Sequence, residues 1–429
     1  MQNQTQKTPT NWVARFFTIW TGQAFSLFGS QLVQFALVWW LAQKSGSATI
    51  LAVATLVGML PQILLGPFAG ALVDRWNRRL IMIVADASIA GFTLLLAWLF
   101  ATGRVQIWHV YAIMAIRALG TAFHFPAMSA STPLMVPEEH LTRLSGMNQT
   151  LQGLMALVAP PVGALLISVM PTQGVLFVDI GTALLAILPL LFLSIPQPER
   201  KVTSSHEGKP SLLQDVREGI AYVRGWPGLV AILLMAVVLN FLLTPTGSLM
   251  PLLITKHFGK GALEFGLTDS AWGLGVIAGG IVLGVWGGFK RRIITALVGI
   301  TGIGAGVMMI AFAPSNGFLL ALAAMVIIGV MNSMANGPLG ALMQSIVRKD
   351  MQGRVMSLTN SAATAMTPIG LLIAGPVSDL IGIRTWYWIA GLISLLMGIA
   401  GFFIPAVMNV EDNHNTETVT APSIASAVE

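Results

Sequence analysis

Cysteine is absent from the 429-residue chain, and charged residues make up only 9% of it. The absence of cysteine excludes disulfides, iron–sulfur clusters, thiolate metal sites and cysteine nucleophiles. Soluble domains carry about 25% charged residues, so the charges here are too few to cover a soluble surface. Apolar residues account for 55% of the chain. We therefore expect an integral membrane protein.

Long apolar segments, separated by short turns with charges, Pro or Gly, can be counted along the chain. A membrane-spanning helix needs about 20 predominantly apolar residues. Twelve spans are predicted, at 16–41, 48–73, 80–102, 107–128, 144–168, 173–195, 228–254, 267–288, 293–313, 318–343, 355–377 and 386–407. The first is too long for a signal-peptide core, so we expect it to be retained.

The distribution of Lys and Arg predicts the orientation. With the N-terminus in the cytoplasm, 17 of the 23 basic residues fall in cytoplasmic segments and 5 on the opposite side, while Arg117 lies within a span. Short cytoplasmic loops carry an excess of basic residues in membrane proteins. We therefore expect both termini in the cytoplasm.

A polar connection at 196–226 divides the chain into two sets of six spans. We expect a cytoplasmic tail at 1–14, a six-helix half at 15–195, a second half at 227–407 and a disordered tail at 408–429. The segment SLLQDVREGIAYVR in the connection places its apolar residues on one helical face, which predicts an amphipathic helix on the membrane surface. A flexible linker is the alternative.

The two halves repeat several features at a nearly constant spacing. The pair Arg78-Arg79 recurs 213 residues later as Arg291-Arg292, and Arg143 recurs 211 residues later as Arg354. Parallel repeats of this kind are found in transporters that rock two halves around a site near the bilayer midplane. The repeat therefore favours a transporter.

GALVDRWNRR at 70–79 resembles the G-x-L-x-D-R-x-G-R-R signature of the major facilitator superfamily. Asn77 stands where the family has Gly, and Asn also tolerates the left-handed conformation of a tight turn. The segments at 16–41, 64–86 and 116–153 resemble the macrolide-efflux branch of that superfamily. The resemblance implies an all-α fold of twelve helices in two pseudo-symmetric halves, in a bacterial cytoplasmic (inner) membrane, and a monomer.

The resemblance also implies a conformational latch that closes the cytoplasmic side. Gly70 would allow close helix contact, Asp74 would face the positive N-terminal end of the eleventh span, and the arginines would pair with acids such as Asp86. The residues of the expected latch are Gly70, Asp74, Arg75, Arg78, Arg79 and Asp86. The alternative is a positively charged anchor with a solvated acid.

Three charged residues lie deep within predicted spans: Asp86, Arg117 and Asp179. An unpaired arginine deep in the bilayer is costly, so Arg117 should face a partner or a watery cavity. His124 lies two helical turns further along the same face and can carry a proton near neutral pH. The candidates for proton coupling are Arg117, Asp179 and His124. A structural pair of Arg117 with Asp179, and a packing role for His124, are the alternatives. No acid is expected at comparable depth in the second half.

GLMALVAPPVGALL at 153–166 resembles an antiporter signature that ends in G-P-x-x-G-G. Proline lacks a backbone donor and bends a helix. We therefore expect Pro160, Pro161 and Gly163 to form an outer gate, with an ordinary kinked helix as the alternative.

Six amide side chains on the expected cavity helices are candidates for contact with the substrate: Gln23, Gln34, Asn240, Asn332, Asn336 and Gln344. Sparse polar groups among Phe, Met and Trp suit large lipophilic molecules. The alternative is that these amides hold helices together.

No segment matches the ATP-binding loop G-x-x-x-x-G-K-[ST], so transport should draw on an ion gradient, with protons as the default. We expect a proton-coupled antiporter of amphiphilic drugs such as macrolides, and thus antibiotic resistance. The expected partners are a small amphiphilic substrate, protons and the lipid bilayer, with an ATP-binding accessory protein left open. We expect no cofactor, no metal, no nucleic acid and no enzymatic activity. The alternatives are an exporter of a siderophore or other metabolite, a polytopic membrane enzyme and a sensor.

Overall fold

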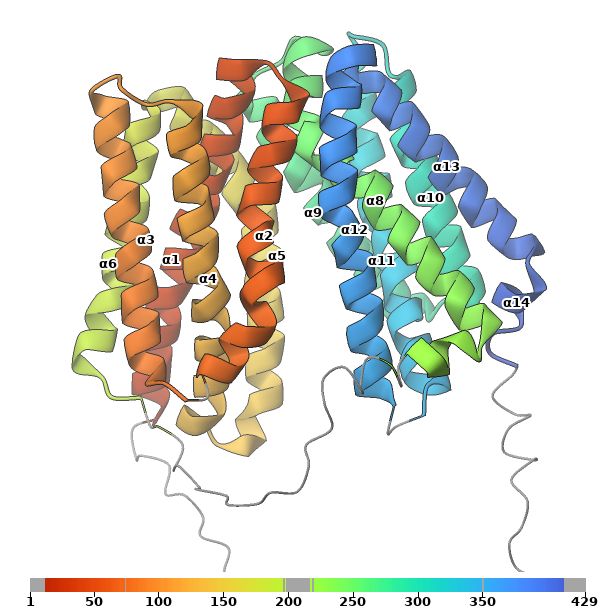
Figure 1. Cartoon of the computed structure of the whole chain (residues 1–429), viewed down its shortest axis with the longest axis horizontal. Helices are drawn as coiled ribbons and strands as arrows, with labels where there is room; N and C mark the ends of the chain where they lie inside the picture. The colour runs from red at the N-terminus through yellow and green to blue at the C-terminus, as the bar shows by residue number, and fades with distance from the viewer. Residues whose placement is uncertain are drawn as a thin grey trace, which may run out of the picture. The chain divides into compact units, whose positions relative to one another are not determined.

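The computed structural model describes residues 12–412 except for 74, 196, 198–216, 218–219 and 349–350. The described residues form long helices and no strand (Figure 1). Twelve of these helices are long and apolar enough to cross a membrane. The expected all-α architecture with twelve spans is confirmed, and the chain is a multi-pass membrane protein.

The helix bounds follow the apolar segments of the sequence. The first six helices are α1 (Trp12–Ser45), α2 (Ala48–Val73), α3 (Arg78–Ala101), α4 (Ile107–Met135), α5 (Glu138–Val169) and α6 (Thr172–Phe192). The others are α8 (Pro227–Lys256), α9 (Ala262–Trp286), α10 (Arg292–Phe312), α11 (Phe318–Ile346), α12 (Gln352–Ile381), α13 (Ile383–Phe403) and the short α14 (Pro405–Met408).

Four helices, α1, α4, α5 and α12, are seven or eight residues longer than the spans that the sequence predicts. Helix α4 continues past residue 128 to Met135, and α5 begins at Glu138 instead of residue 144. Hydropathy marks only the apolar part of a helix, whereas the hydrogen-bonded backbone continues into the more polar residues beyond it. The extension of α4 brings Ser129 and Thr132 to the wall of the cavity described below.

The chain divides into two compact units. Unit 1 comprises residues 1–205 and 248–270, and unit 2 comprises 206–247 and 271–429. The boundaries thus fall within α8 and α9 as well as in the polar connection. Most of the expected amphipathic helix lies outside the described residues, as do residues 1–11 and 413–429.

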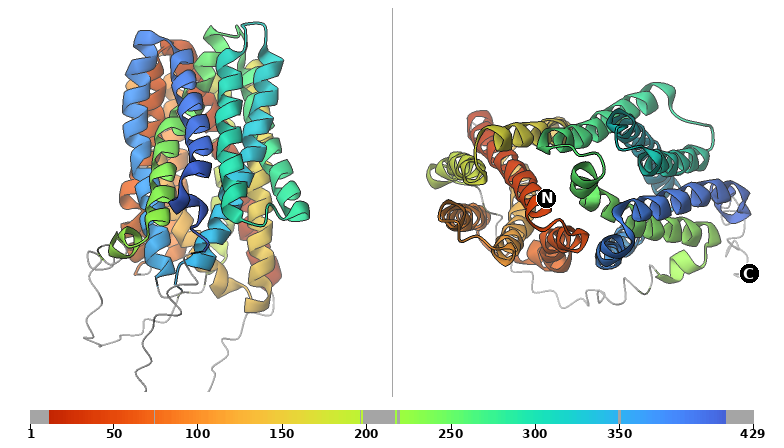
Figure 2. Two further views of the ribbon diagram at one scale, coloured as in Figure 1. Left: turned by 90° about the vertical axis from the view of Figure 1, so that its right-hand side faces the viewer. Right: turned by 90° about the horizontal axis from the view of Figure 1, so that it is seen from above.

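In unit 1 the helices stand side by side. Helix α3 lies against both α4 and α6, and α1 lies against α5 and α6 (Figure 2). The contact of α1 with α6 depends on Gly22, because a Cβ atom there would lie 2.6 Å from the carbonyl oxygen of Leu185. Small residues let helix backbones approach this closely. The approach brings Asp179 of α6 against α1.

Unit 2 is built around α10, which lies against α11 and α13. Two aromatic side chains of α13 attach it to α8. Tyr387 donates a hydrogen bond to the carbonyl oxygen of Thr246 at 2.5 Å, and Trp386 donates one to that of Leu242 at 3.2 Å. These bonds satisfy the polar ends of large rings that are otherwise buried.

Candidate functional site

A cavity of about 410 Å³ is lined by residues of α1, α3, α4 and α5 in unit 1, with one contact from α6. Twelve of its twenty lining residues are polar or charged. Its volume lies in the range of small-molecule sites, about 300–1,000 Å³. The cavity is more polar than the apolar, sparsely polar walls that the sequence led us to expect.

Asp86 of α3 brings a carboxylate to this cavity and is 5% exposed. The side-chain amide of Gln23 on α1 donates a hydrogen bond to its Oδ2 atom at 3.0 Å. From α4, the Nε2 atom of His124 lies 3.4 Å from Oδ1. That nitrogen is buried and has no hydrogen-bond partner among the described residues. The contact is therefore an electrostatic one, and its strength depends on whether the imidazole is protonated.

The position of Asp86 corrects the expected pairing of this acid with the arginines of the 70–79 segment. Arg78 instead donates to the carbonyl oxygen of Ala130 on α4 at 2.6 Å, and Arg79 donates to that of Leu190 on α6 at 2.5 Å. Leu190 lies in the last turn of α6, where carbonyl groups lack partners in their own helix and carry partial negative charge. Asp86 is two turns further along α3, about 12 Å from Arg78.

The structure describes some of the other residues of the expected latch. Asp74 lies outside the described residues, Gly70 is in the last turn of α2, and Arg75 is exposed in the α2–α3 connection. Asn77 has a φ of −70° and accepts a hydrogen bond from the backbone N–H of Leu80 at 3.2 Å. Its role is therefore to cap α3, and a left-handed turn is not needed. The latch stays a prediction.

Arg117 and Asp179 form a buried ion pair between α4 and α6. Nη1 of Arg117 lies 2.6 Å from Oδ2 of Asp179, and the two residues are 9% and 1% exposed. The same Nη1 donates to the hydroxyl of Thr93 at 2.5 Å, and Ser30 donates to Oδ1 of Asp179 at 3.3 Å. This is the structural pair that the sequence analysis left as an alternative.

The ion pair and the cavity are neighbouring but distinct. Arg117 and His124 are seven residues apart on α4, which separates them by about 10 Å along the helix. Ser30 connects the two groups, because it lines the cavity and also donates to Asp179. Asp179 itself does not line the cavity.

The proline segment of α5 lies within an unbroken helix. Pro161 has no N–H to donate to the carbonyl oxygen of Leu157 one turn earlier. Ser270, near the start of α9 and also in unit 1, donates its hydroxyl to that carbonyl at 2.8 Å. Gly163 packs against the ring of Phe35, where a Cβ atom would lie 3.1 Å from the ring edge. The acceptor freed by the proline is thus used in a contact with α9, while the outer gate stays a prediction.

Of the six expected substrate amides, Gln23 lines the cavity. Gln34 is exposed on α1, and Gln344 is exposed on α11. Asn240 donates to the carbonyl oxygen of Ala236 in its own helix at 2.9 Å, and Asn336 donates to the side chain of Asn332 at 3.0 Å. Each of these hydrogen bonds is formed within a single helix. The contact of these amides with a substrate stays a prediction.

Sequence analysis missed three amides of α5 that line the cavity: Asn148, Gln149 and Gln152. Asn148 accepts a hydrogen bond from the indole of Trp20 on α1 at 2.7 Å. The sequence feature that could have indicated them is the polar cluster MNQTLQ near the start of the predicted span 144–168.

Sequence analysis also missed Asp269, which is half-buried. The span was expected to begin at residue 267, which placed Asp269 near its end, whereas α9 begins at Ala262 and Asp269 lies seven residues further along.

The chain is similar to known protein sequences over most of the chain's length. The sequence model of the Major Facilitator Superfamily matches residues 19–366 and 232–426. Macrolide efflux protein A of Streptococcus pyogenes is 34% identical over 389 residues, which cover 91% of this chain and 95% of that protein. The multidrug efflux pump Tap of Mycolicibacterium fortuitum is 26% identical over 402 residues, covering 89% and 94%.

Solved structures share the fold at much lower identity. The nucleoside transporter NupG superposes with a TM-score of 0.67 at 12% identity, covering 91% of this chain and 98% of that one. A D-xylose–proton symporter superposes with a TM-score of 0.64 at 15% identity, covering 90% and 96%. These likenesses concern the arrangement of the helices.

Proposed function

The chain belongs to the major facilitator superfamily, in its macrolide-efflux branch, and from this premise we propose that it exports amphiphilic drugs, macrolides among them, in exchange for protons. Drug efflux is supported by a macrolide efflux protein matched over 95% of its length and by a multidrug efflux pump matched over 94%. The same relatives, and structural neighbours that are transporters, support a protein without enzymatic activity.

Proton coupling is assigned to Asp86, and the observation that carries this assignment is its place on the cavity wall beside His124. An ionised Asp86 attracts a cationic amphiphile, whereas a protonated Asp86 is neutral and releases it. Protonated His124 offers the carboxylate a positive partner in place of the drug. Proton and drug therefore occupy the same carboxylate in alternation, which is the condition for exchange.

Asp179 suits a structural role better. Its carboxylate is 1% exposed, bound to Arg117 at 2.6 Å and hydrogen-bonded by Ser30. A proton on Asp179 would leave the guanidinium buried without its counter-charge, which is strongly unfavourable. A transport cycle that protonated this residue would have to pass through that unfavourable state.

The proposed setting is a bacterial inner membrane with both termini in the cytoplasm. The distribution of basic residues, 17 of 23 in the segments on one side, supports this orientation. It places the α2–α3 connection on the cytoplasmic side. The halves at 15–195 and 227–407 are proposed to alternate access to the cavity.

The test uses the full-length protein in proteoliposomes with an imposed pH gradient and a radiolabelled macrolide. Asp86→Asn is expected to abolish uphill, protonophore-sensitive export and to preserve downhill exchange, because the neutral amide no longer binds a proton. Asp379→Asn neutralises an exposed acid of α12 and is the matched control, with export close to that of the unaltered protein. Uphill export by Asp86→Asn at the normal rate would assign coupling to another residue. Absence of drug transport by the unaltered protein would reject drug efflux itself.

A further inference from the structure

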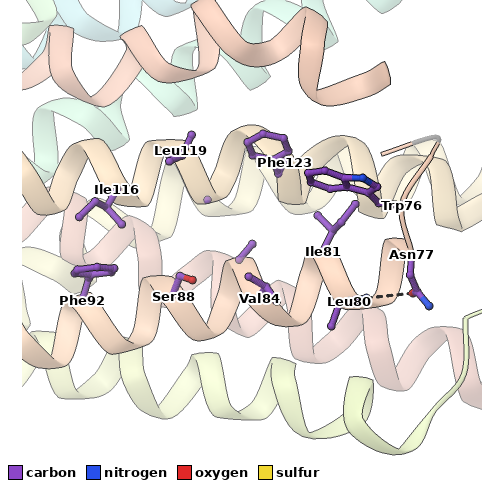
Figure 3. Close-up of a pocket in the computed structure, with 12 residues that line it drawn as sticks. Trp76, Asn77, Leu80, Ile81, Val84, Ser88, Phe92, Ile116, Leu119 and Phe123 are labelled. Carbon is purple, nitrogen blue, oxygen red and sulfur yellow. Dashed lines mark hydrogen bonds between the residues drawn. The ribbon is translucent and has the colours of Figure 1, made fainter. Parts of the chain in front are cut away.

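A second hollow, a groove of about 560 Å³, lies between α3 and α4 in unit 1 (Figure 3). In Figure 3, Ser88 and Phe92 of α3 lie along one side and Ile116, Leu119 and Phe123 of α4 along the other. Apart from Asn77 and Ser88, the lining residues are apolar or aromatic. The groove shares no lining residue with the polar cavity. It is therefore a separate site with a different chemistry.

The groove exists because small residues alternate with large ones along the two helices. Ala85 and Ser88 leave space between the helices, and Gly120 lets α4 approach α3 closely, because a Cβ atom there would lie 2.9 Å from the side chain of Ile89. Val84 and Leu119, on either side of that space, are 54% and 40% exposed. Both helices are long and apolar enough to cross a membrane. An apolar groove with exposed apolar rims on such helices faces the lipid.

The length of the groove matches one lipid leaflet. Its lining on α3 runs from Leu80 to Phe92, twelve residues or about 18 Å along the helix. Half of the hydrocarbon core of a bilayer is about 15 Å thick. A single extended acyl chain therefore fits the groove from the end of α3 towards the midplane.

The mouth of the groove suits a charged headgroup. Trp76 lies at this end and is 55% exposed, in keeping with the enrichment of Trp at membrane–water interfaces. Arg75, next to it in the chain, is also exposed, and arginine near the membrane surface attracts anionic lipids. The side-chain oxygen of Asn77 already caps α3. The segment 74–79 carries three arginines and one acid, so its net charge is positive.

We propose that the α3–α4 groove binds one acyl chain of an anionic phospholipid, with the headgroup at Arg75 and Trp76. In the orientation proposed above, the lipid comes from the cytoplasmic leaflet. The groove and the polar cavity are lined by different faces of the same two helices, since Ala85 and Gly120 line the groove while their neighbours Asp86 and Thr121 line the cavity.

The test is native mass spectrometry of the full-length protein with added phosphatidylglycerol or phosphatidylcholine. Ser88→Phe fills the groove and is expected to retain one phosphatidylglycerol fewer than the unaltered protein. Ala87→Phe, at an exposed neighbouring position that does not line the groove, is the matched control and keeps the unaltered number. Arg75→Gln is expected to lower the preference for phosphatidylglycerol about fivefold.

Equal lipid retention by Ser88→Phe and the unaltered protein overturns the proposal, and so does an equal loss in Ala87→Phe, which indicates a general lipid annulus. Ser88→Leu replaces Ser88→Phe if the larger residue prevents purification. A photoreactive macrolide is also tested on Ser88→Cys. If it labels this variant and phosphatidylglycerol does not compete, the drug occupies the groove and the lipid assignment is overturned. Lipid retention does not depend on transport, so a failure of the proton-coupled mechanism leaves this test unaffected.

Discussion

The Nε2 atom of His124 lies 3.4 Å from Oδ1 of Asp86, buried and without a hydrogen-bond partner among the described residues. The two residues come from adjacent helices, α4 and α3, and the other carboxylate oxygen accepts a hydrogen bond from Gln23 of α1. One acid and one titratable base thus meet at the wall of a cavity. The protonation state of this pair sets the charge that a substrate encounters there.

The first prediction concerns pH-dependent drug binding at this pair. Binding of a cationic macrolide to the unaltered protein is expected to weaken as the pH falls, because protons compete for Asp86 and protonated His124 attracts it. In His124→Gln this pH dependence should be smaller, since one of the two effects is removed. Titration calorimetry on the purified protein at acidic and alkaline pH measures it. An unchanged pH dependence in His124→Gln would remove the imidazole from the coupling mechanism.

The second prediction concerns the ion pair of Arg117 and Asp179. Arg117→Ala leaves a buried carboxylate without its partner and should destabilise the protein by about 3–5 kcal/mol. The double variant Arg117→Met/Asp179→Leu removes both charges and should recover most of that loss. Thermal denaturation in detergent compares the three proteins.

A stable double variant that has lost uphill export would contradict the structural role of this pair. It would show that at least one of the two charges takes part in coupling. The export assay described for Asp86→Asn provides this second measurement on the same samples.

The third prediction concerns the hydrogen bond from Ser270 to the carbonyl oxygen of Leu157. Ser270→Ala leaves this acceptor unpaired and should destabilise the protein by about 1–3 kcal/mol. Pro161→Ala restores an N–H in α5 that can bond to the same carbonyl, so the effect of Ser270→Ala should be much smaller in the Pro161→Ala background. A double-mutant cycle of thermal stabilities measures this coupling.

Ser168→Ala is the control for that cycle. Ser168 also donates to a carbonyl group of α5, that of Leu165, but within its own helix and at an exposed position. Its removal should have little effect in either background. Additive effects of Ser270→Ala and Pro161→Ala would show that the serine does not compensate for the proline.

The fourth prediction concerns orientation in the membrane. The chain contains no cysteine, so single cysteines can be placed without background labelling. Ser205→Cys should react with an impermeant maleimide only from the cytoplasmic side, and Gly317→Cys only from the outside. Reaction of both from the same side would reject the proposed topology.

The sequence by itself determined the twelve spans and the family. Hydropathy is a local property, so each apolar segment predicts a membrane helix without knowledge of its neighbours. The signature at 70–79 is local as well, and it identified a superfamily that the comparisons then showed. The helix bounds differ mainly where a helix continues into polar residues, as at Met135 and Glu138.

The tertiary structure alone decided which polar groups meet. Asp86 and His124 are 38 residues apart, and the way in which α3 and α4 pack turns them towards each other. The same packing directs the guanidinium group of Arg78 to the backbone carbonyl group of Ala130. A buried polar side chain pairs with the nearest suitable group in space, and that distance depends on helix contacts such as the one at Gly22. Hydropathy contains no information about those contacts.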